Sequence, residues 1–80
     1  MNVTGIPTAP VSAGQTVCVT VTGAVGPVKA GEDGSAVVQS VTQSSTRPNE
    51  WTVCFTVGLG LGTVVVTDGK AARTVAIRGR

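Results

Sequence analysis

Apolar and polar residues alternate along two segments of the chain, and this alternation predicts two half-buried β-strands. In residues 15–22, valines alternate with threonines and Cys18. Residues 50–57 repeat the pattern, with Cys54 on the more polar face. Each strand is therefore expected to turn one face toward a core. The predicted inward residues are Val17, Val19 and Val21 in the first strand and Trp51, Val53, Phe55 and Val57 in the second.

A hairpin is predicted near the end of the chain. Residues 62–67 and 71–78 are rich in valine and alanine and flank the dipeptide Asp68-Gly69. This dipeptide is typical of a tight turn in which both central residues have positive φ. The pattern therefore predicts two adjacent antiparallel strands joined by a two-residue turn.

The rest of the chain contains weaker signals that predict three further strand segments. Residues 35–42 predict a strand whose register stays open, because its valines fall on both faces. A short strand is expected around Val28, between two turns marked by Gly-Pro and Asp-Gly. Residues 3–13 contain two prolines and predict an interrupted edge strand.

Together these signals predict an all-β fold without a helix of useful length. Seven short strands, with turn signals about every ten residues, are typical of a two-sheet, immunoglobulin-like sandwich of antiparallel strands. An SH3-like barrel is the alternative. Eighty residues suffice for a single domain, so residues 1–80 are expected to fold as one unit with a proline-containing N-terminal edge segment, 1–13.

Two motifs resemble bacterial and phage immunoglobulin-like (Ig-like) domains. Residues 15–23, with the sequence QTVCVTVTG, are similar to the second strand of such domains. Residues 62–69, which lead into residues 74–77, are similar to their last hairpin. The resemblance implies an Ig-like β-sandwich of the kind found in phage capsid decoration and display proteins.

An immunoglobulin topology would bring the two cysteines together. It makes the second and fifth strands antiparallel neighbours, so Cys18 and Cys54 could face each other and form a disulfide. Two free thiols in a reducing cytoplasm are the alternative. The bridge would lie on an outer sheet face, whereas the antibody disulfide crosses the core.

Charge and hydropathy narrow the possible partners. The net charge is +2, and no run of like charge provides the basic face that nucleic-acid binding requires. No apolar stretch approaches the roughly 18 residues of a membrane span. The N-terminus lacks a secretion signal, so we expect synthesis in a cytoplasm. Only 12% of the residues are charged, which favours a surface that contacts protein.

The residues offer no catalytic machinery. Histidine is absent and no nucleophile stands beside a base, so we expect neither an enzyme nor a cofactor or metal site. The glycine-rich segment 58–62 is interpreted as a connection between sheets, with Leu59 and Leu61 filling the end of the core. The acidic residues are expected in or beside turns, and they are Glu32, Asp33, Glu50 and Asp68.

The last hairpin is the predicted interaction surface. If its large aliphatic residues face the core, the outward side chains are small and uncharged, which is unusual for a solvated sheet face. We expect this face to pack on a second copy or a larger protein partner. The candidate interface residues are Thr63, Val65, Thr67, Ala72, Thr74 and Ala76.

These features favour a non-enzymatic structural or interaction protein. The first hypothesis is a phage virion component, such as a capsid decoration (cement) protein or a head or tail display module that contacts a capsid or tail protein lattice. The alternative is a surface- or carbohydrate-binding module of a bacterial adhesin or secreted enzyme, located at the cell surface or outside the cell. Sugar-binding modules usually stack aromatic residues on the sugar, and the alternation assigns both aromatic residues, Trp51 and Phe55, to the core.

Overall fold

The computed structural model describes all 80 residues as five antiparallel strands without a helix. The prediction of an all-β antiparallel fold is confirmed, whereas the predicted number of seven strands is wrong. In one continuous sheet the order is β1-β2-β4-β3, and β5 pairs with β4. The strands are β1 (Asn2–Thr4), β2 (Thr16–Thr22), β3 (Lys29–Gln43), β4 (Trp51–Thr67) and β5 (Ala72–Gly79).

Two pairs of predicted strands are in fact two long bent strands. β3 joins the short strand expected around Val28 to residues 35–42, and β4 joins residues 50–57 to 62–67. The glycines between the predicted strands do not end them, because β3 and β4 bend together and stay paired on both sides of the bend. Glu32 and Asp33, expected in a turn, therefore lie within β3.

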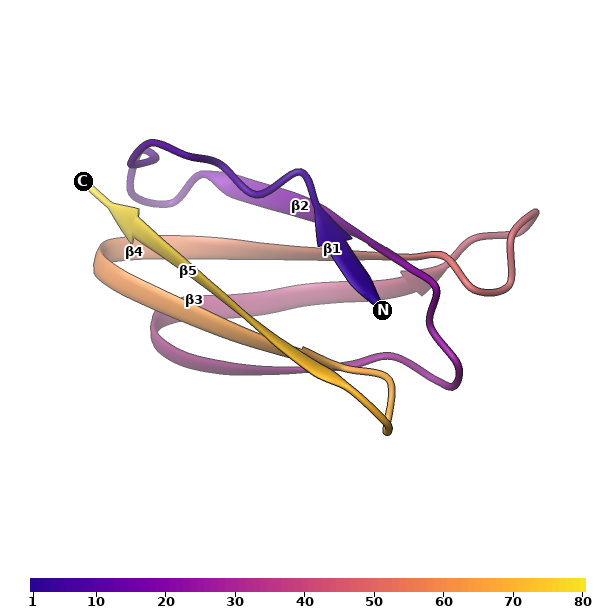
Figure 1. Cartoon of the computed structure of the whole chain (residues 1–80). Helices are drawn as coiled ribbons and strands as arrows, with labels where there is room; N and C mark the ends of the chain where they lie inside the picture. Colours follow the sequence, from indigo (N-terminus) through magenta and orange to yellow (C-terminus); the bar gives the residue numbers. More distant parts are fainter.

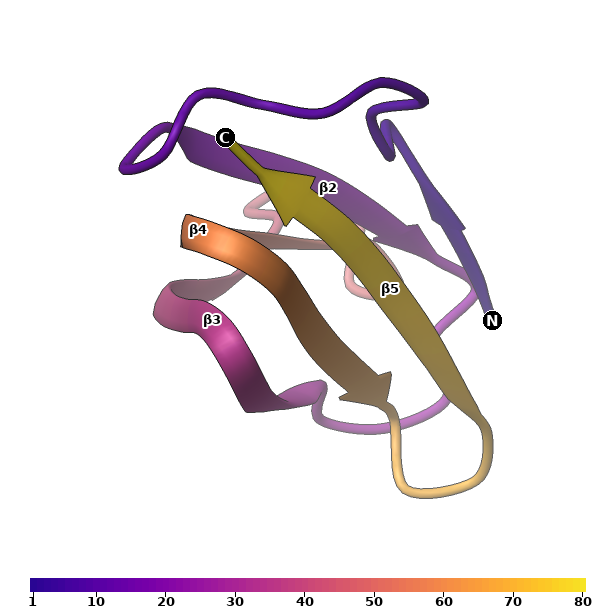
Figure 2. The same cartoon turned by 90° about the vertical axis from the view of Figure 1, so that its left-hand side faces the viewer.

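The bends fold the sheet into two layers, as Figure 1 shows at the left of the molecule and Figure 2 from the side of the bends. One layer contains β1, β2, the first part of β4 and the last part of β3. The other contains the first part of β3, the last part of β4, and β5. Each long strand thus contributes to both layers.

Glycine is required where the bent strands approach one another. Gly34 has a φ of 63°, and a Cβ at this position would overlap the carbonyl oxygen of Leu61. A Cβ on Gly79 would overlap the carbonyl oxygen of Gly58. Both contacts are with backbone atoms, which cannot move aside as a flexible side chain could. The bend therefore depends on residues without a side chain.

A bulge in β3 settles the register that the sequence left open. The pairing shifts between Val38 and Ser40, so that Val38 lies opposite Phe55 and Val41 opposite Val53. Because Phe55 and Val53 face the core, both valines pack against it although they are three positions apart. The bulge explains why simple alternation failed in this segment.

The core lies between the two layers and consists mainly of valine. The inward faces predicted for β2, for residues 53–57 and for the last hairpin are all buried. In contrast, Leu59 is 76% exposed and Leu61 is 51% exposed, so the prediction that they fill the end of the core is wrong. They lie in the bent part of β4 and alternate there with glycines that are less exposed than they are. The buried hydrophobic residues are Val11, Val17, Val19, Val21, Ala24, Val28, Ala36, Val53, Phe55, Val57, Val64, Val66, Val75 and Ile77.

Cys18 and Cys54 form the expected disulfide. They occupy directly opposite positions on β2 and β4, with their Cα atoms 4.1 Å apart. Cys18 is exposed and Cys54 is half-buried, while the apolar residues on either side of each are buried. The bridge therefore lies on the outer face of one layer.

The N-terminal segment connects the two layers a second time. β1 pairs with β2 in the first layer. Further along, the N–H of Val11 donates to the carbonyl of Arg78 at 3.0 Å, and the N–H of Arg80 donates to the carbonyl of Val11 at 2.9 Å. The predicted edge segment is thus a three-residue edge strand followed by a bridge to the end of β5.

Candidate functional site

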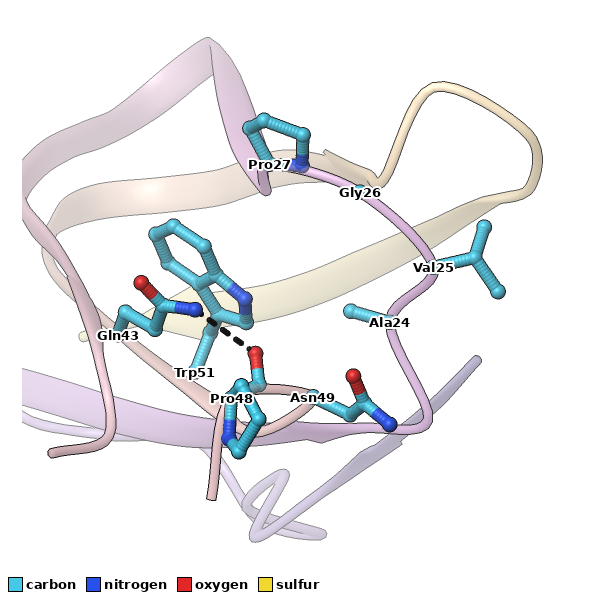
Figure 3. A pocket seen from close by; sticks show the side chains of 8 residues that line it. All are labelled: Ala24, Val25, Gly26, Pro27, Gln43, Pro48, Asn49 and Trp51. Carbon is cyan, nitrogen blue, oxygen red and sulfur yellow. Dashed lines mark hydrogen bonds between the residues drawn. The ribbon is translucent and has the colours of Figure 1, made fainter. Parts of the chain in front are cut away.

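A pocket of about 350 Å³ opens between two loops (Figure 3). Both loops lie at the end of the molecule opposite the bends (Figure 1). The β2–β3 loop, residues 23–28, forms one wall, and the β3–β4 loop, residues 44–50, forms another. Its volume lies at the lower end of the range of small-molecule sites, about 300–1,000 Å³. No charged residue lines it; the lining residues are Ala24, Val25, Gly26, Pro27, Gln43, Pro48, Asn49 and Trp51.

Trp51 is the largest side chain of the pocket, and its prediction as a core residue is only half right. Its ring packs against the core, as the alternation indicated, but the residue is half-buried and also lines the pocket. Trp51 is the first residue of β4 and lies between Val21 and Gln43 on the neighbouring strands. The core is open at this end of the sheet, so part of the indole is accessible from the pocket.

Gln43 and Asn49 contribute neutral polar side chains to the lining, in addition to the indole N–H of Trp51 (Figure 3). The Nε2 atom of Gln43 donates a hydrogen bond to the carbonyl of Pro48 at 2.9 Å, which leaves its Oε1 atom as a free acceptor. The indole N–H of Trp51 and the amide of Asn49 have no partner within the chain. No buried side-chain polar atom is left without a partner, so these groups are open to solvent. The pocket thus presents both donors and acceptors without charge.

Asp68 fixes the wall formed by the β2–β3 loop. Its carboxylate is buried, with 5% of the residue exposed, and its Oδ2 atom accepts the N–H of Val25 at 3.1 Å. Its Oδ1 atom accepts the N–H groups of Ala71 at 2.8 Å and Lys70 at 3.0 Å. One side chain therefore closes the turn between β4 and β5 and also holds the pocket loop.

The two loops are also joined directly. The N–H of Ala24 donates to the carbonyl of Asn49 at 3.0 Å. A Cβ added to Gly26 would lie 2.9 Å from the carbonyl oxygen of Asp68, so the loop packs closely on the hairpin turn. These contacts hold the pocket walls at a fixed separation.

The hydrogen bonds to Asp68 keep its carboxylate ionised. Donation by the N–H groups of Ala71, Val25 and Lys70 lowers the pKa of Asp68 to about 2, although burial acts in the opposite direction. The turn itself differs from the predicted one. Gly69 has a φ of 89°, but Asp68 does not have positive φ, and four residues rather than two separate Thr67 from Ala72.

The other acidic residues serve the backbone or lie at the surface. The carboxylate of Glu32 accepts the N–H of Val38 at 2.7 Å, and that of Asp33 accepts the N–H of Gly34 at 2.9 Å. Glu50 lies 4.0 Å from the exposed Arg47. No three histidine, cysteine or acidic residues gather closely enough to hold a metal ion.

The structure brings the six candidate interface residues together. They form three directly opposed pairs on the outward face of β4 and β5: Thr63 with Ala76, Val65 with Thr74, and Thr67 with Ala72. Val65 is 40% exposed. The exposed Leu61 extends the row, although its partner Arg78 adds a charge at that end.

Sequence reasoning missed the pocket because its walls come from two loops with no pattern of their own. The available signal was the position of Trp51, at the start of a strand and three residues after Pro48.

Comparisons with protein-family models, curated proteins and solved structures found no match for the chain. The structure also contains no helix with the length and hydropathy to cross a membrane.

Proposed function

We propose that this chain is a non-enzymatic structural and interaction protein, a five-stranded Ig-like sandwich that serves as a phage virion component. Its role is that of a capsid decoration protein or a head or tail display module. The observation that carries the proposal is the uncharged patch of three cross-strand pairs on the outer face of the β4–β5 hairpin. The small domain size and the resemblance of residues 15–23 and 62–69 to phage Ig-like domains give further support.

The composition of this face favours a protein partner. A solvated sheet face usually carries charged side chains, because they limit association between sheets. Here three adjacent cross-strand pairs contain only threonine, valine and alanine. Such small side chains allow a partner surface to approach the backbone closely. The proposed partner is a capsid or tail protein lattice.

Particle composition tests the proposal. Particles purified from cells that make the chain are expected to contain it in many copies by quantitative mass spectrometry. Val65→Asp and Ala76→Asp should remove it from the particles, because each buries an unpaired charge at the interface. The matched control is Thr52→Asp, which places a charge on the exposed outer face of the other layer. Absence of the parent chain from the particles would reject the proposal.

The accessible face of Trp51 favours a second candidate function, that of a surface- or carbohydrate-binding module. Sugar-binding modules usually stack aromatic residues on the sugar, and the sequence pattern assigned both aromatic residues of this chain to the core. Phe55 is 1% exposed and does belong there, but Trp51 lines the pocket. Binding of the intact chain to glycan-coated surfaces tests this broader function, whichever part of the chain is responsible.

A further inference from the structure

We infer that the Trp51 pocket binds one neutral sugar unit, stacked on the indole and held by the amides of Gln43 and Asn49. This inference rests on the second candidate function and names its site and ligand class. None of the six interface residues lines the pocket, so the sugar site and the protein interface are separate surfaces of one chain.

The indole provides the apolar part of the site. A sugar ring has faces made of C–H groups, which pack well on a large, rigid aromatic surface. Trp51 is held at the start of β4 between two neighbouring strands and packs on the core, so its orientation is fixed before a ligand arrives. Pro27 and Pro48 add rigid apolar walls beside it.

The polar groups match hydroxyls better than any charged ligand. Each hydroxyl can donate and accept, and the pocket offers acceptors and donors from Gln43, Asn49 and the Trp51 N–H. The hydrogen bond from Gln43 to Pro48 fixes the direction of the free oxygen. An anionic or cationic ligand would find no opposite charge among the lining residues and would lose its hydration without compensation.

A proline-rich peptide is the competing occupant of an aromatic pocket. Grooves that bind such peptides are lined with aromatic side chains on which the proline rings pack. This pocket has one aromatic residue, and its other rigid walls are themselves prolines. The free amide oxygens of Gln43 and Asn49 would find no donor on proline, which has no N–H. The lining therefore favours a sugar.

The walls are built to keep this shape without a ligand. The contacts of Asp68 with Val25 and of Ala24 with Asn49 hold the two loops in place. A site that is already ordered loses less conformational entropy on binding. Binding is consequently expected without rearrangement of the strands.

Titration of the intact, disulfide-bonded chain with neutral monosaccharides tests the inference. The probes are methyl glucoside, methyl galactoside, methyl mannoside and N-acetylglucosamine, with glucuronic acid as a charged comparison. Trp51 is the only tryptophan, so its fluorescence reports the site directly, and amide chemical shifts locate the contact. At least one neutral sugar should change both signals at millimolar concentration, with amide shifts confined to residues 24–26, 43 and 49–51.

Variants separate the site from the fold. Asn49→Ala lies on an exposed loop and should weaken binding about tenfold while leaving the thermal unfolding temperature unchanged. Trp51→Phe keeps a ring in place if Trp51→Ala does not fold, and it should weaken binding by a similar factor in the chemical-shift assay. Thr52→Asp, the next residue but on the opposite face, should bind like the parent.

Three outcomes would overturn the inference. They are no response to any neutral sugar, a response to a proline-rich peptide in place of sugar, and equal binding by the parent and the Asn49→Ala chain. A glycan array run with the same variants distinguishes failure of the Trp51 sugar site from failure of the surface- or carbohydrate-binding function as a whole. Parent and Asn49→Ala chains that bind the array equally would leave the surface-binding function standing and move its site elsewhere, whereas no binding by either would remove both.

Discussion

Asp68 links the hairpin turn to the pocket because its side-chain carboxylate accepts hydrogen bonds from backbone N–H groups of both. Its two carboxylate oxygens accept three N–H groups, two from the turn and one from the β2–β3 loop. A buried carboxylate is stable here because these donors replace its lost water. The sequence placed Asp68 beside a turn but gave no indication of the bond to Val25, which is 43 residues away.

Asp68→Asn should lower the unfolding temperature and loosen the pocket loop. The new amide has one acceptor oxygen and an NH₂ group that faces backbone donors, so at least one N–H loses its partner. Thermal unfolding at neutral pH measures stability, and amide hydrogen exchange at Val25 measures the loop. Asp33→Asn, at an exposed site with one local hydrogen bond, is the control and should change neither. Equal effects of the two variants would contradict this role.

The same residue predicts a loss of stability in acid. The pKa of Asp68 is about 2 in the folded chain, below the value of about 3.9 for an unfolded aspartate. Its contribution is therefore fully present above about pH 4 and is lost as the pH falls toward 2. Urea unfolding across this range should show a steep fall in the parent chain. The fall should be shallower in Asp68→Asn, and parallel curves would contradict the assignment.

At the scale of the strand, the alternation correctly predicted which side chains point toward the core, but it did not predict where the strands begin and end. The inward valines of β2, β4 and β5 were correctly identified because a two-residue period needs no knowledge of the partner strand. A glycine that ends a strand and a glycine that lets two paired strands bend together have the same local pattern. For Gly34 and the glycines of residues 58–62, only the pairing of β3 with β4 shows that they allow a bend and do not end a strand.

Gly79→Ala should destabilise the chain by about 1–3 kcal/mol, the usual cost of overpacking. The new methyl group would overlap the backbone carbonyl of Gly58, so β5 would have to move away from the bend of β4. Gly31→Ala is the matched control, because it lies in β3 with nothing near its Cβ position and without positive φ. Chemical unfolding should leave this control equal to or slightly more stable than the parent. Equal loss in both would contradict close packing at Gly79.

At the scale of the whole molecule, the sequence predicted an all-β antiparallel fold and the disulfide but not the pocket. The outward positions of Cys18 and Cys54 followed from the alternation within each strand. Partial exposure of Trp51 and exposure of Leu59 depend on what the other layer and the loops cover, and this information lies elsewhere in the chain. The same reason left the candidate site unseen until both loops were placed.

The disulfide constrains more of the chain than the two strands it joins. Cys18 and Cys54 are 36 residues apart, and the loop between them contains all of β3, one of the two strands that belong to both layers. In the chain-entropy model, closing a loop of this length contributes roughly 4 kcal/mol, a large share of the stability expected for a small domain. Replacing both cysteines by serine should therefore lower the urea midpoint strongly. Thr20→Ser with Thr52→Ser changes the next pair on the same face and should have little effect. If both double variants unfold at the parent's midpoint, β3 is held in place by its pairing with β4 alone.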